Sequence, residues 1–134
     1  MKKLLYLGIL LILGSCGSNV ESTKTIVYMD GREVSTIKID NLEVTEDLGG
    51  MDWDKAKKAI ESLGNGWRLP TKDELNVLYE NREKLGSVPN AFYWGSTEHS
   101  TNYVWGKNFY KNENWEIYLN TESGSYPVRA VRDF

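Results

Sequence analysis

An α+β fold is predicted for this chain of 134 residues, because two helical patterns are followed by a series of short strand patterns. The helical patterns cover residues 52–63 and the segment that begins after Pro70, and the later strand patterns begin at Ala91. A hairpin pattern precedes both helices. We therefore expect two helices packed on a small antiparallel sheet with a loop-rich C-terminal half, as a single domain over residues 25–134.

The amino terminus has the order of regions found in a secretory signal. Lys2 and Lys3 precede an apolar run, residues 4–13, which is short for a membrane-spanning helix. The run ends in Leu-Gly-Ser-Cys, which resembles the lipobox of bacterial lipoproteins and implies cleavage before Cys16 and lipidation of that residue. We expect a signal peptide over residues 1–15 and a lipidated polar tether over 16–24; a plain secretory signal or a short membrane anchor are the alternatives.

The charge balance and the single cysteine limit the function classes. Cys16 is the only cysteine, so a lipidated Cys16 leaves no thiol for a disulfide, a metal cage or a nucleophile. The net charge is −3, which argues against nucleic acid as a partner. The expected location is the bacterial cell envelope, anchored by lipid. The positions after Cys16 are Gly17 and Ser18, and neither is an acidic residue of the kind that retains a lipoprotein in the inner membrane. We therefore expect the protein to be anchored in the outer membrane.

The first part of the domain is predicted to be a hairpin over about residues 25–39. Asp30-Gly31 is a favoured two-residue turn between segments rich in β-branched residues. With that turn, Val27 is expected to face Val34 across the strands. Residues 41–44 are expected to form a further short strand, followed by a loop over residues 45–50.

The first helix is predicted over residues 52–63. Its apolar residues recur at helical spacing, and charged residues lie largely off that stripe. Gly64 stands where a left-handed residue ends many helices.

The stretch "GNGWRLPTKDEL", residues 64–75, is predicted to join the two helices. Pro70 prevents a helix from continuing out of Arg68, and Thr71 and Glu74 have the spacing of a capping box that starts the second helix. Arg68 is expected to pair with a carboxylate or with backbone carbonyls. The competing interpretation is a charged catalytic cluster of Arg68, Asp73 and Glu74; we favour the structural role, because capping and turn chemistry account for each residue.

From Ala91 onward, short strand patterns alternate with turns: "AFYWGS", "YVWGKNF", "WEIYL" and "YPVRAV". In "WEIYL", Trp115, Ile117 and Leu119 alternate on one side. Trp94, Trp105 and Trp115 occupy motif or alternating positions, so we expect these three side chains to be largely buried.

Three motifs in order, "GWRLPTKDEL", "YWGST" and "VRAVR", together with the strand at Trp105, resemble the Lcl C-terminal domain family. The family is named from a bacterial collagen-like adhesin and is similar to the Fibrobacter-type major paralogous domains and, more distantly, to the formylglycine-generating sulfatase modifiers. The resemblance covers about residues 52–132 and implies a C-type-lectin-like fold. Gly95 departs from the pattern, since the family usually has Ser there. The residues that carry the signature are Trp67, Arg68, Leu69, Pro70, Thr71, Glu74, Trp94, Trp105, Arg129 and Arg132.

The sequence offers no convincing catalytic or metal site. The oxidation chemistry of the formylglycine-generating relatives uses paired cysteines, which this chain lacks. Glu98, Glu113 and Glu122 lie in separate segments, and nothing in their spacing pairs them as hydrolytic carboxylates. His99 is the sole histidine, and one histidine beside Glu98 falls short of a metal ligand set. We therefore expect no enzyme activity, no cofactor and no metal.

Aromatic and amide side chains crowd into the last third of the chain and suit recognition of a sugar or a protein. The candidate ligand-binding residues are Glu98, His99, Asn102, Tyr103, Tyr110, Asn112 and Tyr118. The expected function is a lipid-anchored, adhesin-like binding module of the envelope whose partner is a glycan or an envelope or host protein. The alternative is a structural subunit of a cell-surface assembly with no soluble ligand.

Overall fold

The computed structural model describes residues 24–27, 31–86, 92–118 and 124–134. The expected signal peptide, Cys16, most of the tether, Asp30 and Glu122 lie outside the described residues. Within them the chain forms, in order, β1 (Lys24–Val27), β2 (Glu33–Ile39), β3 (Leu42–Thr45), β4 (Gly50–Met51), α1 (Trp53–Glu61), α2 (Lys72–Glu80), the 3₁₀ helix η1 (Arg82–Leu85), β5 (Phe92–Ser100), β6 (Tyr103–Asn108), β7 (Glu113–Tyr118), β8 (Tyr126–Pro127) and β9 (Val131–Asp133).

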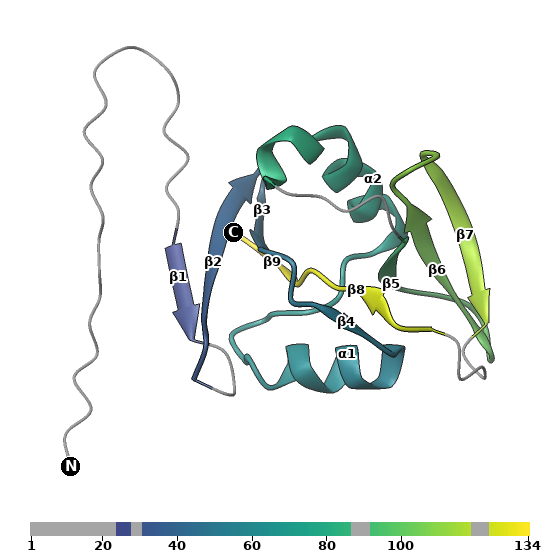
Figure 1. Ribbon diagram of the computed structural model, residues 1–134, viewed down its shortest axis with the longest axis horizontal. Coiled ribbons are helices and arrows are strands. Elements are labelled where there is room, and N and C mark those ends of the chain that lie inside the picture. The colour runs from purple at the N-terminus through teal and green to yellow at the C-terminus, as the bar shows by residue number, and fades with distance from the viewer. Residues whose placement is uncertain (1–23, 28–30, 87–91, 119–123) are drawn as a thin grey trace.

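The described strands form three small antiparallel sheets rather than the one sheet expected. Their strand orders are β1-β2-β3-β9, β4-β8 and β5-β6-β7. The first sheet joins the N-terminal hairpin to the last strand of the chain. Figure 1 shows α1 and α2 on opposite sides of the molecule with β4, β8 and β9 between them. The predicted α+β class is confirmed, and no helix among the described residues is long and apolar enough to cross a membrane.

The N-terminal hairpin forms, but the predicted register is wrong by one residue. Val34 pairs with Ile26 rather than with Val27, which pairs with Glu33. A one-residue shift moves every side chain of a strand to the other face of the sheet. In the observed register Ile26 packs with the buried Val34 on the core. Burial of that pair therefore sets the register.

The first helix forms, but it is shorter than the predicted range 52–63: it runs from Trp53 to Glu61, with Asp52 and Ser62 as its cap residues. Asp52 is the N-cap residue, and its side chain accepts a hydrogen bond of 2.8 Å from the backbone N–H of Lys55. Ala56 and Ile60 bury the helix against the core. Gly64 has a φ of 61°, as predicted, and its N–H donates to the carbonyl of Glu61 at 3.0 Å. Its left-handed conformation turns the chain towards the second helix.

The predicted capping box opens α2. The backbone N–H of Glu74 donates to the hydroxyl of Thr71 at 3.2 Å, and the backbone N–H of Thr71 donates to the carboxylate of Glu74 at 2.9 Å. Two N–H groups that have no partner inside the helix are thereby satisfied. Leu75 and Leu78 are buried and pack α2 against the core.

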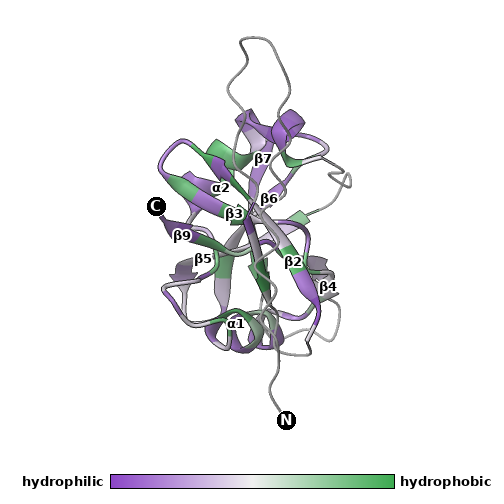
Figure 2. Cartoon of the chain, turned by 90° about the vertical axis from the view of Figure 1, so that its left-hand side faces the viewer, coloured by the Kyte–Doolittle hydropathy of each residue, from purple (hydrophilic) through white to green (hydrophobic). Residues whose placement is uncertain are grey.

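The core consists of two clusters of buried side chains. One cluster packs on α1 and includes Trp67, Leu69, Trp94 and Val128. The other packs on α2 and includes residues from β2, β3, β5 and β9. Along both helices hydrophilic and hydrophobic residues alternate, as Figure 2 shows, so each helix buries one side against its own cluster.

The three tryptophans that were expected to be buried differ in their exposure. Trp94 is buried, as predicted, whereas Trp105 is half-buried. The prediction for Trp115 is wrong, because 44% of this residue is exposed. Trp115 lies on β7, an edge strand of its sheet, and alternation along an edge strand does not ensure that another layer covers the apolar side.

Candidate recognition surface

The signature motif is used mainly to hold distant segments together. Arg68 donates two hydrogen bonds to the carboxylate of Glu74 and one, of 3.2 Å, to Asp133 near the end of the chain. Its backbone pairs with Val131. The hydrogen bond to Glu74 raises the pKa of Arg68, although burial opposes the effect. Arg68 has therefore found the carboxylate that its sequence context predicts.

The pKa of Glu74 is set by opposing effects. Burial by itself would raise it, but the hydrogen bonds from Arg68 and from the backbone of Thr71 outweigh burial and lower it. Glu74 is therefore a stable carboxylate with both oxygens engaged. Asp73, the third member of the hypothesised catalytic cluster, is exposed, and the Arg68 side chain donates to Glu74 and Asp133 instead. This geometry is that of a structural ion pair.

The remaining signature arginines also form structural contacts. Arg132 donates to the buried carboxylate of Glu43 at 2.7 Å, and its guanidinium lies 4.7 Å from the centre of the Trp67 ring. Arg129 is buried and donates to the carbonyl of Thr45 at 3.1 Å. Both arginines therefore connect the end of the chain to the N-terminal sheet.

Trp94 and Tyr93 point to opposite faces of β5. The indole N–H of Trp94 donates to the carbonyl of Met51 at 2.7 Å. The hydroxyl of Tyr93 donates to Asp47 at 3.1 Å, and burial, partly opposed by Arg129, raises the pKa of Tyr93 to about 12. A phenol with this pKa stays protonated and is a poor proton acceptor at neutral pH, which favours a structural role.

Gly95 allows a close approach of two strands. A Cβ atom at this position would lie 2.4 Å from the carbonyl oxygen of Trp105 and 3.1 Å from Leu75. The neighbouring Ser96 contacts the segment that precedes α2, because its backbone N–H donates to the carbonyl of Pro70 at 2.8 Å. The adjacent Thr97 accepts a hydrogen bond from the backbone N–H of Lys72 at 2.9 Å. The backbone around Gly95 therefore has no room for a larger side chain.

Four of the predicted ligand-binding residues lie together at the tip of the β5–β6 hairpin: Glu98, His99, Asn102 and Tyr103. His99 Nε2 is 3.2 Å from a carboxylate oxygen of Glu116 on β7. The His99 ring lies edge-on to Trp105 with their centres 5.3 Å apart. All of the predicted residues in this group are exposed. The tip is therefore a polar surface built around one half-buried indole.

Lys72 covers Trp105 at this tip. Its ammonium lies 3.7 Å from the centre of the Trp105 ring, an approach that attracts a cation to the ring electrons. Lys72 is the first residue of α2, far from Trp105 in the sequence. The contact was not predicted, since it depends on how the helix packs on the sheet. An incoming ligand would have to displace Lys72 to stack on that side of the ring.

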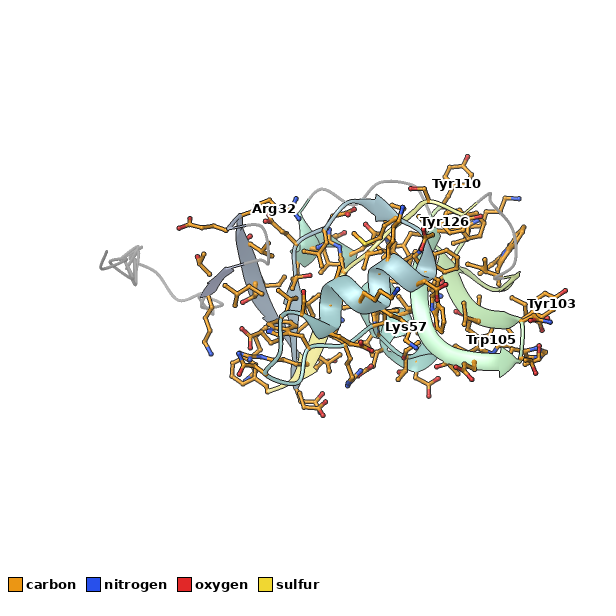
Figure 3. The ribbon with its side chains drawn as sticks, turned by 90° about the horizontal axis from the view of Figure 1, so that it is seen from below. Arg32, Lys57, Tyr103, Trp105, Tyr110 and Tyr126 are labelled. Carbon is orange, nitrogen blue, oxygen red and sulfur yellow. The ribbon has the colours of Figure 1, made fainter. Side chains whose placement is uncertain are left out.

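Tyr110 and Asn112 lie at the other end of the sheet, in the β6–β7 turn. At about 3.3 Å per residue, β6 alone separates its two ends by about 17 Å. Figure 1 shows the two turns at opposite ends of the β5-β6-β7 sheet, and Figure 3 shows Tyr103 and Tyr110 apart. Tyr110 is 67% exposed and Tyr103 is 37% exposed. The structure does not describe the side chain of Tyr118, another predicted residue. The predicted residues that it does describe therefore do not converge on one site.

Trp115 is an exposed ring that the sequence analysis had assigned to the core. Its indole N–H donates to the carboxylate of Glu113 at 2.8 Å. Phe92 lies against it with ring centres 5.2 Å apart, and Phe92 in turn contacts Tyr126 at 5.5 Å. Tyr126 packs on the buried Trp94 at 4.9 Å. A chain of aromatic contacts therefore leads from the core to an exposed indole that is held in a fixed orientation.

The signal for this arrangement was present in "ENWEIY". Residues two apart on a strand share a face, so Glu113 is expected beside Trp115. The missing information was that β7 is an edge strand. Glu116 points to the opposite face, where it meets His99. The two acids of β7 therefore serve different surfaces.

The described residues contain no group of three or more His, Cys, Asp or Glu side chains that could hold a metal ion. Lys107 is a buried amine whose Nζ donates to Asn76 at 2.7 Å, and burial lowers its pKa. It lies under α2 beside the Tyr79 ring rather than on the exposed surface. The arrangement suits a packing role in which an amide satisfies the amine.

Two comparisons with known proteins bear on this chain. A sequence model of the Lcl C-terminal domain matches residues 22–132. This match begins before β1 and ends within β9, so it includes the N-terminal hairpin that the motif resemblance alone left out. A search of curated proteins found no match.

Proposed function

Because the chain belongs to the Lcl C-terminal domain family, we propose that it is a non-catalytic binding module of the bacterial cell envelope. Its ligand is a glycan or a protein. The observation that carries this proposal is the set of exposed aromatic side chains on the β5-β6-β7 sheet and in its β6–β7 turn: Tyr103, Tyr110 and Trp115. Exposed rings of this kind are enriched where proteins recognise partners.

The contacts of the signature residues support a non-catalytic role. Arg68 and Glu74 of the motif are engaged with each other, and Glu74 also accepts a backbone hydrogen bond. A catalytic carboxylate needs access to a substrate, and both oxygens of Glu74 already accept hydrogen bonds. The surface that remains exposed is aromatic and polar. It suits binding better than turnover.

A lipid at Cys16 would hold the domain at the membrane, and we place it in the outer membrane. The tether then separates the lipid from β1, which begins at Lys24. Palmitate labelling of cells that express the full chain tests this anchor. We expect label on the wild-type chain and none on Cys16→Ser. Equal labelling of the two, or release of both as soluble proteins, would contradict the anchor.

We also assign the domain to the C-type-lectin-like folds. Two features support the assignment: two helices accompany small antiparallel sheets, and the last strand pairs with the N-terminal sheet through β3 and β9. An experimental structure compared with that fold class tests it. A different strand order in the β5-β6-β7 region would count against it.

The binding function is tested with the full chain in detergent, on an array of glycans and mucins with and without calcium. Crosslinking in the native envelope, followed by mass spectrometry, is the parallel arm. Saturable binding to a glycan, or a reproducible crosslink to one protein that does not require a fixed stoichiometric assembly, supports the module. Stoichiometric co-purification with envelope proteins and a blank array would favour a structural subunit instead.

A further inference from the structure

Cations of this chain lie over several of its own aromatic rings, but none of the described residues places one over Trp115. Of the five tryptophans, Trp94 is buried, and three others have a basic group over the ring: Trp53 with Lys57 at 4.5 Å, Trp67 with Arg132 at 4.7 Å and Trp105 with Lys72 at 3.7 Å. No cation from the described part of the chain lies over Trp115. Phe92 lies against this ring, but 44% of Trp115 is exposed, so part of the ring is accessible to a cation from outside.

A carboxylate lies at the edge of this open ring. Glu113 accepts a hydrogen bond from the indole N–H through Oε2, which fixes the orientation of the ring. Glu113 is an exposed residue, so its carboxylate is accessible to a partner. Within the described residues, Glu113 forms no ion pair. An indole face beside a carboxylate is complementary to a guanidinium, which stacks on aromatic rings and donates in-plane hydrogen bonds.

The strand that carries this pair is open at one side. β7 pairs with β6, and no described strand pairs with its outer edge. Figure 1 shows β7 at the rim of the molecule. An edge strand presents unpaired N–H and C=O groups that can add an extended segment of another chain. The strand contains no proline or lysine, which often protect such edges.

From these two features we propose that β7 docks an extended basic segment of a partner protein, with an arginine of that segment stacked on Trp115 and paired with Glu113. The inference rests on the proposed binding function and names its partner class. The charge agrees, since the chain carries a net −3 and a basic partner is attracted to it. A sulfated glycan would instead place its anions beside Glu113.

The test uses the full chain in detergent and three synthetic decapeptides. The first alternates Thr and Arg, the second alternates Thr and Gln, and the third is the Thr-Arg peptide with central prolines that cannot pair with an edge strand. Tryptophan fluorescence and calorimetry report binding. We expect the Thr-Arg peptide to bind, and to bind about tenfold more tightly than either of the others.

The variants separate the site from general attraction between opposite charges. Trp115→Ala is expected to weaken binding of the Thr-Arg peptide about tenfold. Glu113→Gln is expected to weaken it several-fold while keeping an acceptor for the indole N–H. Glu116→Gln is the matched control, because it removes the same charge from the same strand on the opposite face and should change binding little. Phe134→Ala tests whether any exposed ring suffices: this ring is exposed but lies beside Lys24 and Lys38, away from β7, so its removal should leave binding of the Thr-Arg peptide unchanged.

Three outcomes would overturn the inference. Equal effects of Glu113→Gln and Glu116→Gln would show that only net charge matters. Unchanged binding in Trp115→Ala would exclude the ring. Failure of all three peptides, with a neutral glycan bound instead through Trp115, would refute a basic protein partner yet leave the proposed binding function standing. Only a chain that binds neither peptides, glycans nor a crosslinked partner would refute both.

Discussion

Glu74 connects the capping box to the Arg68 ion pair, so its substitution tests the structural interpretation of the signature motif. Glu74→Ala removes the acceptor for the backbone N–H of Thr71 and both hydrogen bonds from Arg68. The lost cap is worth about 1 kcal/mol. The Arg68 side chain is 37% exposed, so water screens the pair and its share is also about 1 kcal/mol. We expect the free energy of unfolding to fall by about 2 kcal/mol.

Two further variants divide that loss between its parts. Glu74→Gln keeps an oxygen for the Thr71 N–H but removes the charge, so it is expected to cost about 1 kcal/mol. Thr71→Ala removes the other half of the capping box and is also expected to cost about 1 kcal/mol, without changing ligand binding. Glu61→Ala is the control. This exposed acid ends α1, and its replacement should change stability little.

The pH dependence provides a second readout. The pKa of Glu74 is lower in the folded protein than its ordinary value of 4.5, so its carboxylate stabilises the fold at pH values above 4.5. This stabilisation is lost as the pH falls through the folded pKa. Urea unfolding followed by tryptophan fluorescence should therefore show a gap between wild type and Glu74→Gln that is full at neutral pH and shrinks in acid. A gap that is absent at neutral pH, or that grows in acid, would refute the reasoning.

Three other substitutions probe the sheet that carries the aromatic surface. Trp94→Phe removes the donor to Met51 and leaves a small cavity, so it should cost about 2 kcal/mol in urea unfolding; a loss below about 0.5 kcal/mol would contradict the buried hydrogen bond. Gly95→Ser forces a Cβ against the carbonyl of Trp105 and should cost about 1–3 kcal/mol; an unchanged unfolding midpoint would show that the strands can separate. The pKa of Tyr93 is about 12 in the folded protein and near 10 in the unfolded chain, so the free energy of unfolding should fall as the pH rises from about 10 to 12. In Tyr93→Phe that decline should be smaller, and an absorbance titration should lose the phenol that ionises last.

Local chemistry allowed both helices, and the capping box that starts α2, to be predicted from the sequence. Thr71 and Glu74 act within one turn of the backbone groups that they cap, and Gly64 takes its left-handed conformation locally, so their positions alone are informative. The predicted hairpin register was wrong because the register depends on contacts with the core rather than on the turn. Ile26 must share a face with Val34, and the turn residues do not carry that information.

The exposed surface was harder to predict for the same reason. Trp94 and Trp115 both stand in apolar patterns, yet one is buried under β8 and the other lies on an edge strand. Alternation indicates which residues share a face, but it does not indicate whether a second layer covers that face. The cover over Trp105 is a lysine of α2, which no pattern near Trp105 reveals.

The contacts of the domain divide its signature motif from its candidate surface in a way that can be measured. The signature residues join segments far apart in sequence: Arg68 reaches Asp133, Arg132 reaches Glu43 and Trp94 reaches Met51. Trp115, by contrast, contacts Glu113 on its own strand and the ring of Phe92. Much of its indole is exposed to solvent rather than packed in the core. Substitutions in the first group should therefore lower stability before they affect binding, because a loosened scaffold still presents the same side chains until it unfolds. Substitution of Trp115 should do the reverse, and an equal loss of stability in Trp115→Ala and Trp94→Ala would mean that the exposed indole belongs to the scaffold after all.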